Sequence, residues 1–119
     1  MTSRAAVQRY ISLLMESRNQ AHRFHMTTKS YAEHKSLQAY YEGIVPLFDS
    51  YAEAYMGKYG RLGRISPNRR ITKPGSKVYF RALANQVRRL RLPRDPYLRA
   101  LQDDIMALIR STLYMLTLK

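Results

Sequence analysis

The longest helical pattern in the chain is residues 30–60, SYAEHKSLQAYYEGIVPLFDSYAEAYMGKYG. Ser30 is followed three residues later by Glu33, and this spacing matches a capping box, in which two side chains satisfy free backbone N–H groups at a helix start. The helix is predicted to run to Tyr55 or Met56, because glycines that can form a C-cap follow directly. This segment therefore predicts one long helix with a defined beginning and end.

Three further helical patterns flank this segment. On the N-terminal side, apolar residues three, four or seven apart predict a helix from Ser3 to about Phe24. On the C-terminal side, a shorter helix is predicted from Lys77 to Leu92, and a fourth begins with Asp95 as N-cap and Pro96 at its first position. The predicted inward positions are Val7, Ile11, Leu14, Ala21 and His25 in the first helix, Phe80, Leu83, Val87 and Leu90 in the third, and Leu98, Leu101, Ile105, Leu108, Thr112 and Leu116 in the fourth.

The length and composition are those of one domain. The chain has 119 residues, 45% of them apolar, and this is enough for a buried core. No alternating strand pattern and no internal repeat is evident. We therefore expect residues 1–119 to form a single all-α domain, an antiparallel four-helix bundle. The chain has no cysteine, which excludes a disulfide scaffold, a thiolate zinc site and a cysteine nucleophile.

No segment predicts a membrane span. The most apolar stretch, Ile105 to Leu118, contains Arg110 and is shorter than the roughly 20 residues that cross a bilayer. We therefore expect a soluble protein without a membrane partner. No nucleophile motif and no glycine-rich phosphate cradle occurs, so a hydrolase or a nucleotide-driven enzyme is not expected.

The region of about 57–76, between the second and third predicted helices, has a different composition. It holds four of the five glycines and two of the five prolines, which predicts a long irregular loop. A long loop of this kind is more often functional than inert. Between Lys58 and Arg94 the chain has twelve cationic residues and no acid: Lys58, Arg61, Arg64, Arg69, Arg70, Lys73, Lys77, Arg81, Arg88, Arg89, Arg91 and Arg94.

This cluster accounts for most of the formal net charge of +13, which attracts polyanions. The expected partner is nucleic acid or an acidic protein surface, with Tyr59 and Tyr79 as candidate stacking aromatics. No recognition helix, zinc finger or RNA-recognition signature accompanies the cations, so binding is expected to be independent of base sequence. The alternative interpretation is a solvated basic face that keeps the protein soluble.

A polar stripe on the second predicted helix suggests a second kind of site. At 100° per residue, His34, Gln38, Glu42, Asp49 and Glu53 share one face. His34 and Glu53 lie about 28 Å apart along one helix, so one copy cannot gather them around a metal. Two copies packed antiparallel through this helix can, which predicts a homo-oligomer, at least a dimer. A di-iron site within one bundle is not expected, because no Glu-x-x-His motif occurs.

A histidine near the end of the first helix, a histidine early in the second and an Asp-x-x-x-Glu pair late in the second resemble the starvation-type DNA-protection proteins. These are the Dps-like mini-ferritins of the ferritin-like superfamily. The resemblance implies a ferritin-like bundle and iron ligands between two subunits, with an amide where the family has a carboxylate. The residues that it places in these roles are His22, with His25 as a second candidate three residues out of register, His34, Gln38, Asp49 and Glu53.

The runs Ser-Tyr-Ala-Glu-His-Lys from Ser30 and Ala-Tyr-Met-Gly-Lys-Tyr-Gly from Ala54 are also similar to small bacteriophage proteins that are predicted to be ferritin-like. This similarity implies a location in the host cytoplasm or in a virion. Three functions follow as expectations. The first is sequence-independent nucleic-acid binding in DNA compaction, protection or interference with host machinery, which requires no cofactor. The second is an iron-oxidising mini-ferritin with an intersubunit site. The third is a virion structural protein or host-protein-binding scaffold without catalysis.

Overall fold

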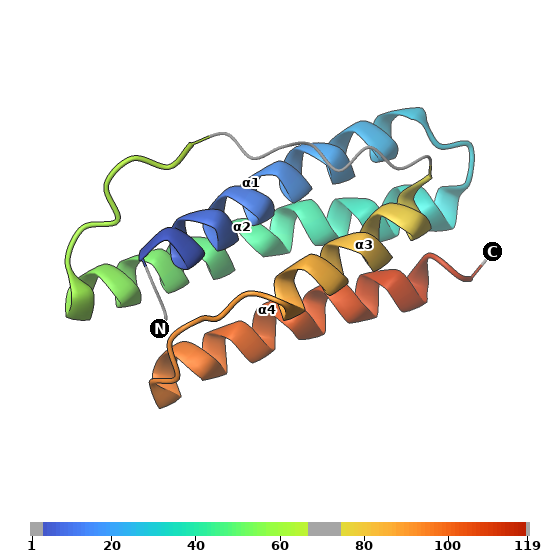
Figure 1. Cartoon of the computed structure of the whole chain (residues 1–119). Coiled ribbons are helices and arrows are strands. Elements are labelled where there is room, and N and C mark those ends of the chain that lie inside the picture. Colours follow the sequence, from blue (N-terminus) through green and yellow to red (C-terminus); the bar gives the residue numbers. More distant parts are fainter. Residues whose placement is uncertain (1–3, 67–74, 119) are drawn as a thin grey trace.

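The computed structural model describes residues 4–66 and 75–118, and this part of the chain contains four α-helices and no strand. The helices are α1 (Arg4–Thr27), α2 (Tyr31–Tyr59), α3 (Ser76–Arg88) and α4 (Pro96–Met115). The prediction of an all-α chain with two long helices, a short helix and another long helix is confirmed (Figure 1). The third helix ends at Arg88 instead of Leu92, because the chain turns at residues 89–90 before it reaches Pro93.

The helices pack in a ring around one core. α1 contacts α2 and α3, and α4 contacts the same two helices. Each of these neighbouring pairs runs antiparallel, whereas α2 and α3 lie diagonally and run in the same direction (Figure 1). Consequently, residues 60–75 connect the end of α2 to the start of α3 at the opposite end of the molecule.

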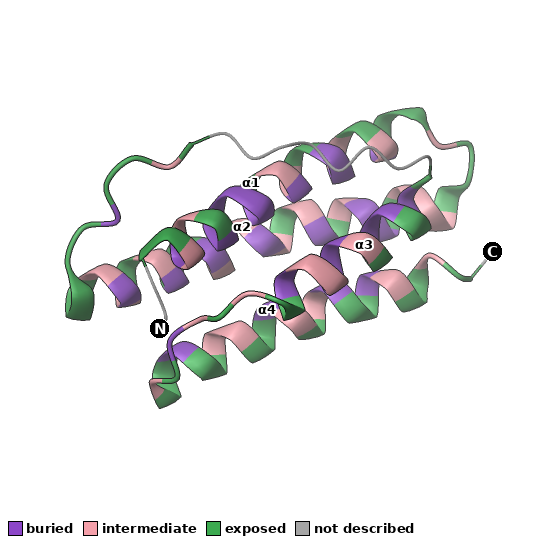
Figure 2. Cartoon of the chain, in the orientation of Figure 1, coloured by how far each residue is buried: buried purple, intermediate pink, exposed green. Residues whose placement is uncertain are grey.

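The core follows the predicted stripes with two differences (Figure 2). All five predicted positions of α1 are buried, and so are the three predicted positions within α3. In α4 the buried residues are Leu98, Ile105, Ile109 and Thr112, while Leu101, Leu108 and Leu116 are half-buried, as is Leu90 after α3. Leu90 and Leu116 lie beyond the last residues of α3 and α4, and Ile109 is a buried position of α4 that the pattern did not predict.

One of the two hydrogen bonds of the predicted capping box is present at the start of α2. The Ser30 hydroxyl accepts a hydrogen bond from the Glu33 N–H at 3.2 Å. The prediction of the reciprocal hydrogen bond, from the Ser30 N–H to the Glu33 side chain, is wrong, because the Ser30 N–H donates to the Thr28 hydroxyl at 3.1 Å. The Glu33 carboxylate instead accepts hydrogen bonds from the hydroxyls of Thr28 and Ser76. Glu33 therefore ties the first residue of α3 to the start of α2.

The connection after α2 begins at Gly60, so the predicted loop boundary of about 57 lies three residues too early. Gly60 has φ 91°, a left-handed conformation that glycine adopts at low cost, and its N–H donates to the Met56 carbonyl at 3.0 Å. Beyond it, Leu62 is 2% exposed, and its carbonyl accepts a hydrogen bond from the Gln8 amide of α1. The described start of the basic loop is thus anchored on α1.

Candidate nucleic-acid interface

The predicted basic residues lie on the surface. Three of the twelve, Arg69, Arg70 and Lys73, lie outside the described residues. The other nine are all exposed: Lys58, Arg61, Arg64, Lys77, Arg81, Arg88, Arg89, Arg91 and Arg94. Within residues 4–66 and 75–118, Lys58 alone of these nine forms an ion pair with a carboxylate. The positive charge of this segment is therefore directed to solvent and mostly uncompensated by the protein's own acids.

The topology gathers most of these cations in one half of the molecule. The start of α1, the end of α2 and the start of α4 lie at one end, and the α3–α4 connection runs to that end from the last residues of α3, which lie near the middle of the bundle (Figure 1). We call this end, together with the last residues of α3 and the α3–α4 connection, the basic end. Its exposed cations are Lys58, Arg61, Arg64, Arg88, Arg89, Arg91 and Arg94, joined by Arg4 and Arg9 of α1 and Arg99 of α4. Lys77 and Arg81 lie in the first half of α3, away from this end.

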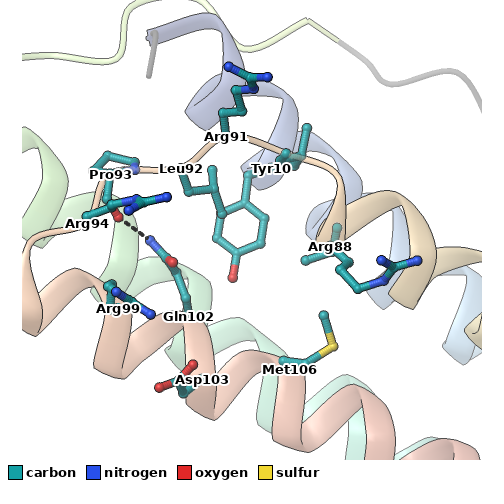
Figure 3. A pocket seen from close by; sticks show the side chains of 12 residues that line it. Tyr10, Arg88, Arg91, Leu92, Pro93, Arg94, Arg99, Gln102, Asp103 and Met106 are labelled. Carbon is teal, nitrogen blue, oxygen red and sulfur yellow. Dashed lines mark hydrogen bonds between the residues drawn. The ribbon is translucent and has the colours of Figure 1, made fainter. Parts of the chain in front are cut away.

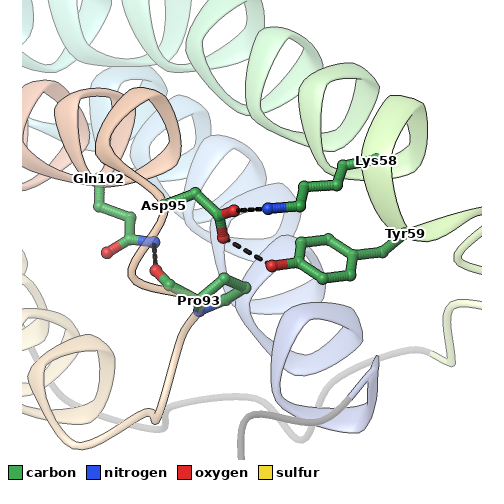
Figure 4. A network of polar contacts seen from close by, with 5 residues as sticks. All are labelled: Lys58, Tyr59, Pro93, Asp95 and Gln102. Carbon is green, nitrogen blue, oxygen red and sulfur yellow. Dashed lines mark hydrogen bonds and ion pairs between the residues drawn. The ribbon is translucent and has the colours of Figure 1, made fainter.

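One acid of the basic end is held by an internal network (Figure 4). The Asp95 carboxylate accepts hydrogen bonds from the Lys58 ammonium group and, at 2.7 Å, from the Tyr59 hydroxyl. Asp95 occupies the predicted N-cap position of α4, but its side chain forms no capping hydrogen bond. The contacts lower the pKa of Asp95, with the Lys58 hydrogen bond as the largest cause and the Tyr59 hydrogen bond second. The network joins the end of α2 to the start of α4.

Removing this carboxylate changes how stability depends on pH. Because the pKa of Asp95 is lower in the folded protein, its contacts stabilise the fold above the ordinary carboxyl pKa and lose this effect as the pH falls through the lowered value. We expect Asp95→Asn to be less stable than the wild type at neutral pH, by a modest amount because the Lys58 side chain is 52% exposed. Thermal unfolding over a pH series measures this difference. It should shrink below about pH 4, and a constant difference would contradict the assignment.

The basic end contains an open cleft of about 850 Å³ between the α3–α4 connection, α1 and α4 (Figure 3). Four arginines line it, namely Arg88, Arg91, Arg94 and Arg99, and Asp103 is the acid among its lining residues. None of these arginines forms an ion pair with a carboxylate of the described chain. The other lining residues are Tyr10, the polar Gln102 and five apolar residues: Val87, Leu90, Leu92, Pro93 and Met106.

Tyr10 forms the floor of this cleft, and its hydroxyl is buried without a hydrogen-bond partner among the described residues. Two other core tyrosines have partners: Tyr51 accepts a hydrogen bond from Gln102 at 2.9 Å, and Tyr40 bonds Ser17 at 2.7 Å. An unpartnered buried hydroxyl costs about 1–3 kcal/mol. The pKa of Tyr10 is raised, and burial is the largest cause. The hydroxyl therefore keeps its proton and remains a donor.

The structure corrects the stacking role of one predicted aromatic. Tyr79 is 1% exposed and packs edge-on against Phe24 and Phe80, so it is not available to a base. Tyr59 is 42% exposed and lies at the basic end, where its hydroxyl is bound to Asp95. Of the two aromatics, only Tyr59 is exposed. Tyr10, which the sequence did not single out, is the aromatic of the cleft.

The structure brings the three histidines together at the opposite end. The rings of His25 and His34 stack with centroids 3.7 Å apart, and His22 stacks on Tyr41 at 4.3 Å. The Nδ1 atom of His25 lies 2.8 Å from the His34 carbonyl, and that of His34 lies 3.0 Å from the His25 carbonyl. Because a carbonyl only accepts, both Nδ1 atoms carry a proton and donate. These two hydrogen bonds therefore stabilise the turn between α1 and α2.

The other predicted metal ligands are not assembled with the histidines in one copy. Asp49 and Glu53 are exposed on α2, and the Gln38 amide donates to Glu42 at 3.2 Å. In the part of the chain that the structure describes, no three histidine or acidic side chains form a group that could hold a metal ion. The predicted iron site draws its ligands from two copies, so it stays a prediction.

The fold and the basic end together define a small, strongly basic all-α protein. None of its described helices has the length and apolarity that a membrane span needs. The chain belongs to the family of unknown function DUF5856, whose model matches residues 25–116. This match includes α2, α3, α4 and the four cleft arginines, and it begins after Tyr10.

A relative comes from a bacteriophage. The chain is 29% identical over 112 residues to the "uncharacterized 14.6 kDa protein in mobD-ri intergenic region" of Enterobacteria phage T4. The alignment covers 92% of this chain and 87% of the phage protein, so the similarity extends over nearly the whole of both. No solved structure matches the chain.

Proposed function

We propose that the protein binds nucleic acid through the basic end, by electrostatic contact with phosphates and without reading base sequence. The observation that carries the proposal is that the nine described cations of the segment from Lys58 to Arg94 are exposed and only one of them is ion-paired within the described chain. Guanidinium groups match phosphate oxygens in geometry and charge. A surface of this kind neutralises phosphates and releases their counterions.

The arrangement of the cations supports a continuous contact. Seven of the nine described cations lie at the basic end, where three more arginines from α1 and α4 join them. No recognition-helix signature accompanies these cations in the sequence, so phosphate contacts supply the affinity. In a phage-infected cell, the consequences would be DNA compaction, protection, packaging or interference with host nucleic-acid machinery.

The salt dependence of duplex binding tests the proposal. If about six cations contact phosphates, affinity for a short DNA duplex should fall by about 10³-fold or more between about 50 and about 200 mM salt. Two duplexes of unrelated sequence should give the same slope in fluorescence anisotropy. Absence of binding at low salt, or binding that does not respond to salt, would reject the function. A large preference for one duplex would reject the sequence independence.

The ferritin-like ancestry belongs to the same proposal. Ferritin-like bundles contain one long crossover connection, and here residues 60–75 join opposite ends of two parallel helices. Self-association through α2 would multiply the number of basic ends on one particle and raise the affinity for a long polyanion. The scaffold alternative without nucleic acid predicts instead a protein partner that survives nuclease treatment.

A further inference from the structure

The cleft of the basic end is lined by residues of two chemical kinds. Its four arginines are accompanied by one acid, Asp103, which leaves an excess of three positive charges. Apolar side chains, among them Leu90, Leu92 and Met106, lie between the charged ones. Figure 3 shows the Tyr10 hydroxyl in the middle of the cleft, between Arg88 on one side and Arg94 and Arg99 on the other. A ligand that complements both kinds of residue carries a strong anion attached to a flat, largely apolar group.

We propose that this cleft binds a single nucleotide through its terminal phosphate, either as a free nucleotide or at the end of a strand. The choice of a nucleotide as the carrier of the phosphate rests on the proposed function. The phosphate lies among Arg88, Arg94 and Arg99 and accepts a hydrogen bond from the Tyr10 hydroxyl. The base packs on the apolar side chains that line the cleft. The cleft is thus a discrete site within a surface that is otherwise a general polyanion contact.

Size and charge favour a nucleotide end over the middle of a duplex. The volume of about 850 Å³ lies within the range of small-ligand sites, about 300–1,000 Å³. A double helix, whose major groove alone is about 12 Å wide, does not fit inside such a cleft. A terminal phosphate carries about 1.5 to 2 negative charges, against one for an internal phosphodiester, and so matches the excess of positive charge better.

Tyr10 gives the site its specific donor. The residue is fully buried, and its hydroxyl is without a partner in the described chain although core packing alone would be served by phenylalanine. A phosphate oxygen is the acceptor that this hydroxyl lacks, and a hydrogen bond to a charged group is one of the stronger ones in proteins. Because the hydroxyl is covered in the free protein, the side chains above it part when the phosphate enters.

Titration calorimetry with the full chain tests the site. The probes are a deoxynucleoside 5′-monophosphate, the matching nucleoside, inorganic phosphate, and a strand of about ten nucleotides with a 5′-phosphate or a 5′-hydroxyl. At about 150 mM salt, where exposed charges are screened, the nucleotide should bind and the nucleoside should not. If the nucleotide and the phosphorylated strand both bind, the site accepts both sources. If only one of them binds, that source is the ligand.

Two matched variants separate the cleft from the rest of the fold. Tyr10→Phe should weaken nucleotide binding by about tenfold or more, the effect of losing a hydrogen bond to a charged group. Tyr79→Phe removes the other buried unpartnered tyrosine hydroxyl, which does not line the cleft, and should leave binding unchanged. Arg94→Gln, at an exposed position, should also weaken nucleotide binding. Equal affinities of Tyr10→Phe and Tyr79→Phe for the phosphorylated probe that the wild type binds would overturn the proposal. So would a terminal phosphate that improves the binding of neither the nucleoside nor the strand.

The same variants distinguish this inference from the proposed function. Tyr10→Phe should bind a blunt duplex without terminal phosphates as the wild type does, because that contact depends on the exposed cations. If the wild type binds the nucleotide or the phosphorylated strand end but not the duplex, the general function is rejected and the cleft is supported. If it binds the duplex and a terminal phosphate improves the binding of neither the nucleoside nor the strand, the cleft alone is rejected.

Discussion

Reversing the charge of Arg88, Arg91 and Arg94 together should weaken duplex DNA binding by about 10²-fold or more at about 50 mM salt. All three side chains are exposed at the basic end, and none is paired with a carboxylate of the described residues. Substitution by glutamate removes three phosphate contacts and adds three repulsive charges at the same place. The slope of log affinity against log salt should become shallower by about three, because each lost phosphate contact removes the release of about one counterion.

The matched control reverses Lys29, Lys35 and Arg110, which are equally exposed but lie toward the opposite end of the helices. Both triple variants lower the net charge of +13 by the same amount, so they differ only in where the charge is lost. The control should keep most of its affinity and its steep slope. Similar losses in both variants, measured by anisotropy on proteins with matching circular dichroism, would show that net charge alone drives binding and would remove the basic end as the interface.

Truncating Phe80 to alanine should lower the free energy of unfolding by about 3–5 kcal/mol, the cost of losing a large buried ring and leaving a cavity. Phe80 is fully buried and packs edge-on against Tyr40, with ring centroids 4.7 Å apart, and against Tyr79. It is one of the few large residues with which α3, a helix of 13 residues, is attached to the others. This loss is a large part of the whole free energy of unfolding, which is about 5–15 kcal/mol for a domain of this kind.

Denaturant and thermal unfolding measure this loss, with an expected fall in Tm of about 10 °C or more. Val78→Ala is the control, because Val78 belongs to the same helix and is 43% exposed. Its effect should stay within about 0.5 kcal/mol. Equal effects of the two substitutions would contradict the packing of α3 described above.

Local sequence was sufficient for the helices and for most of the core. The capping serine, the position of Pro96 and the spacing of the apolar residues act within one or two turns, so their effect is visible without the rest of the chain. The errors concern burial and contacts between helices. Leu101 and Leu108 are half-buried and Ile109 is buried, because the packing of α4 on its neighbours, and not the periodicity alone, sets which side chains are covered. Glu33 bonds Ser76 instead of completing its own cap.

The candidate site divides in the same way. The run of cations without an acid can be read directly from residues 58–94, and its exposure follows because unpaired charges are costly to bury. The cleft cannot be read in this way, because Tyr10 and Arg94 come from distant parts of the chain and meet only when α1 packs beside the α3–α4 connection. The histidines show the same limit: their spacing suggested metal ligands, and packing placed two of them in a reciprocal hydrogen-bonded stack.

The four helices, their approximate bounds and most of their inward faces were thus determined by the sequence, because periodicity and capping act over short distances along the chain, and the total charge follows from the composition. The direction of α3 relative to α2, the collection of ten cations at the basic end and the buried Tyr10 hydroxyl beneath the arginines were decided by the tertiary structure. The physical reason is that burial is a property of the packed helices together, and which side chains share a cleft depends on contacts between residues far apart in sequence.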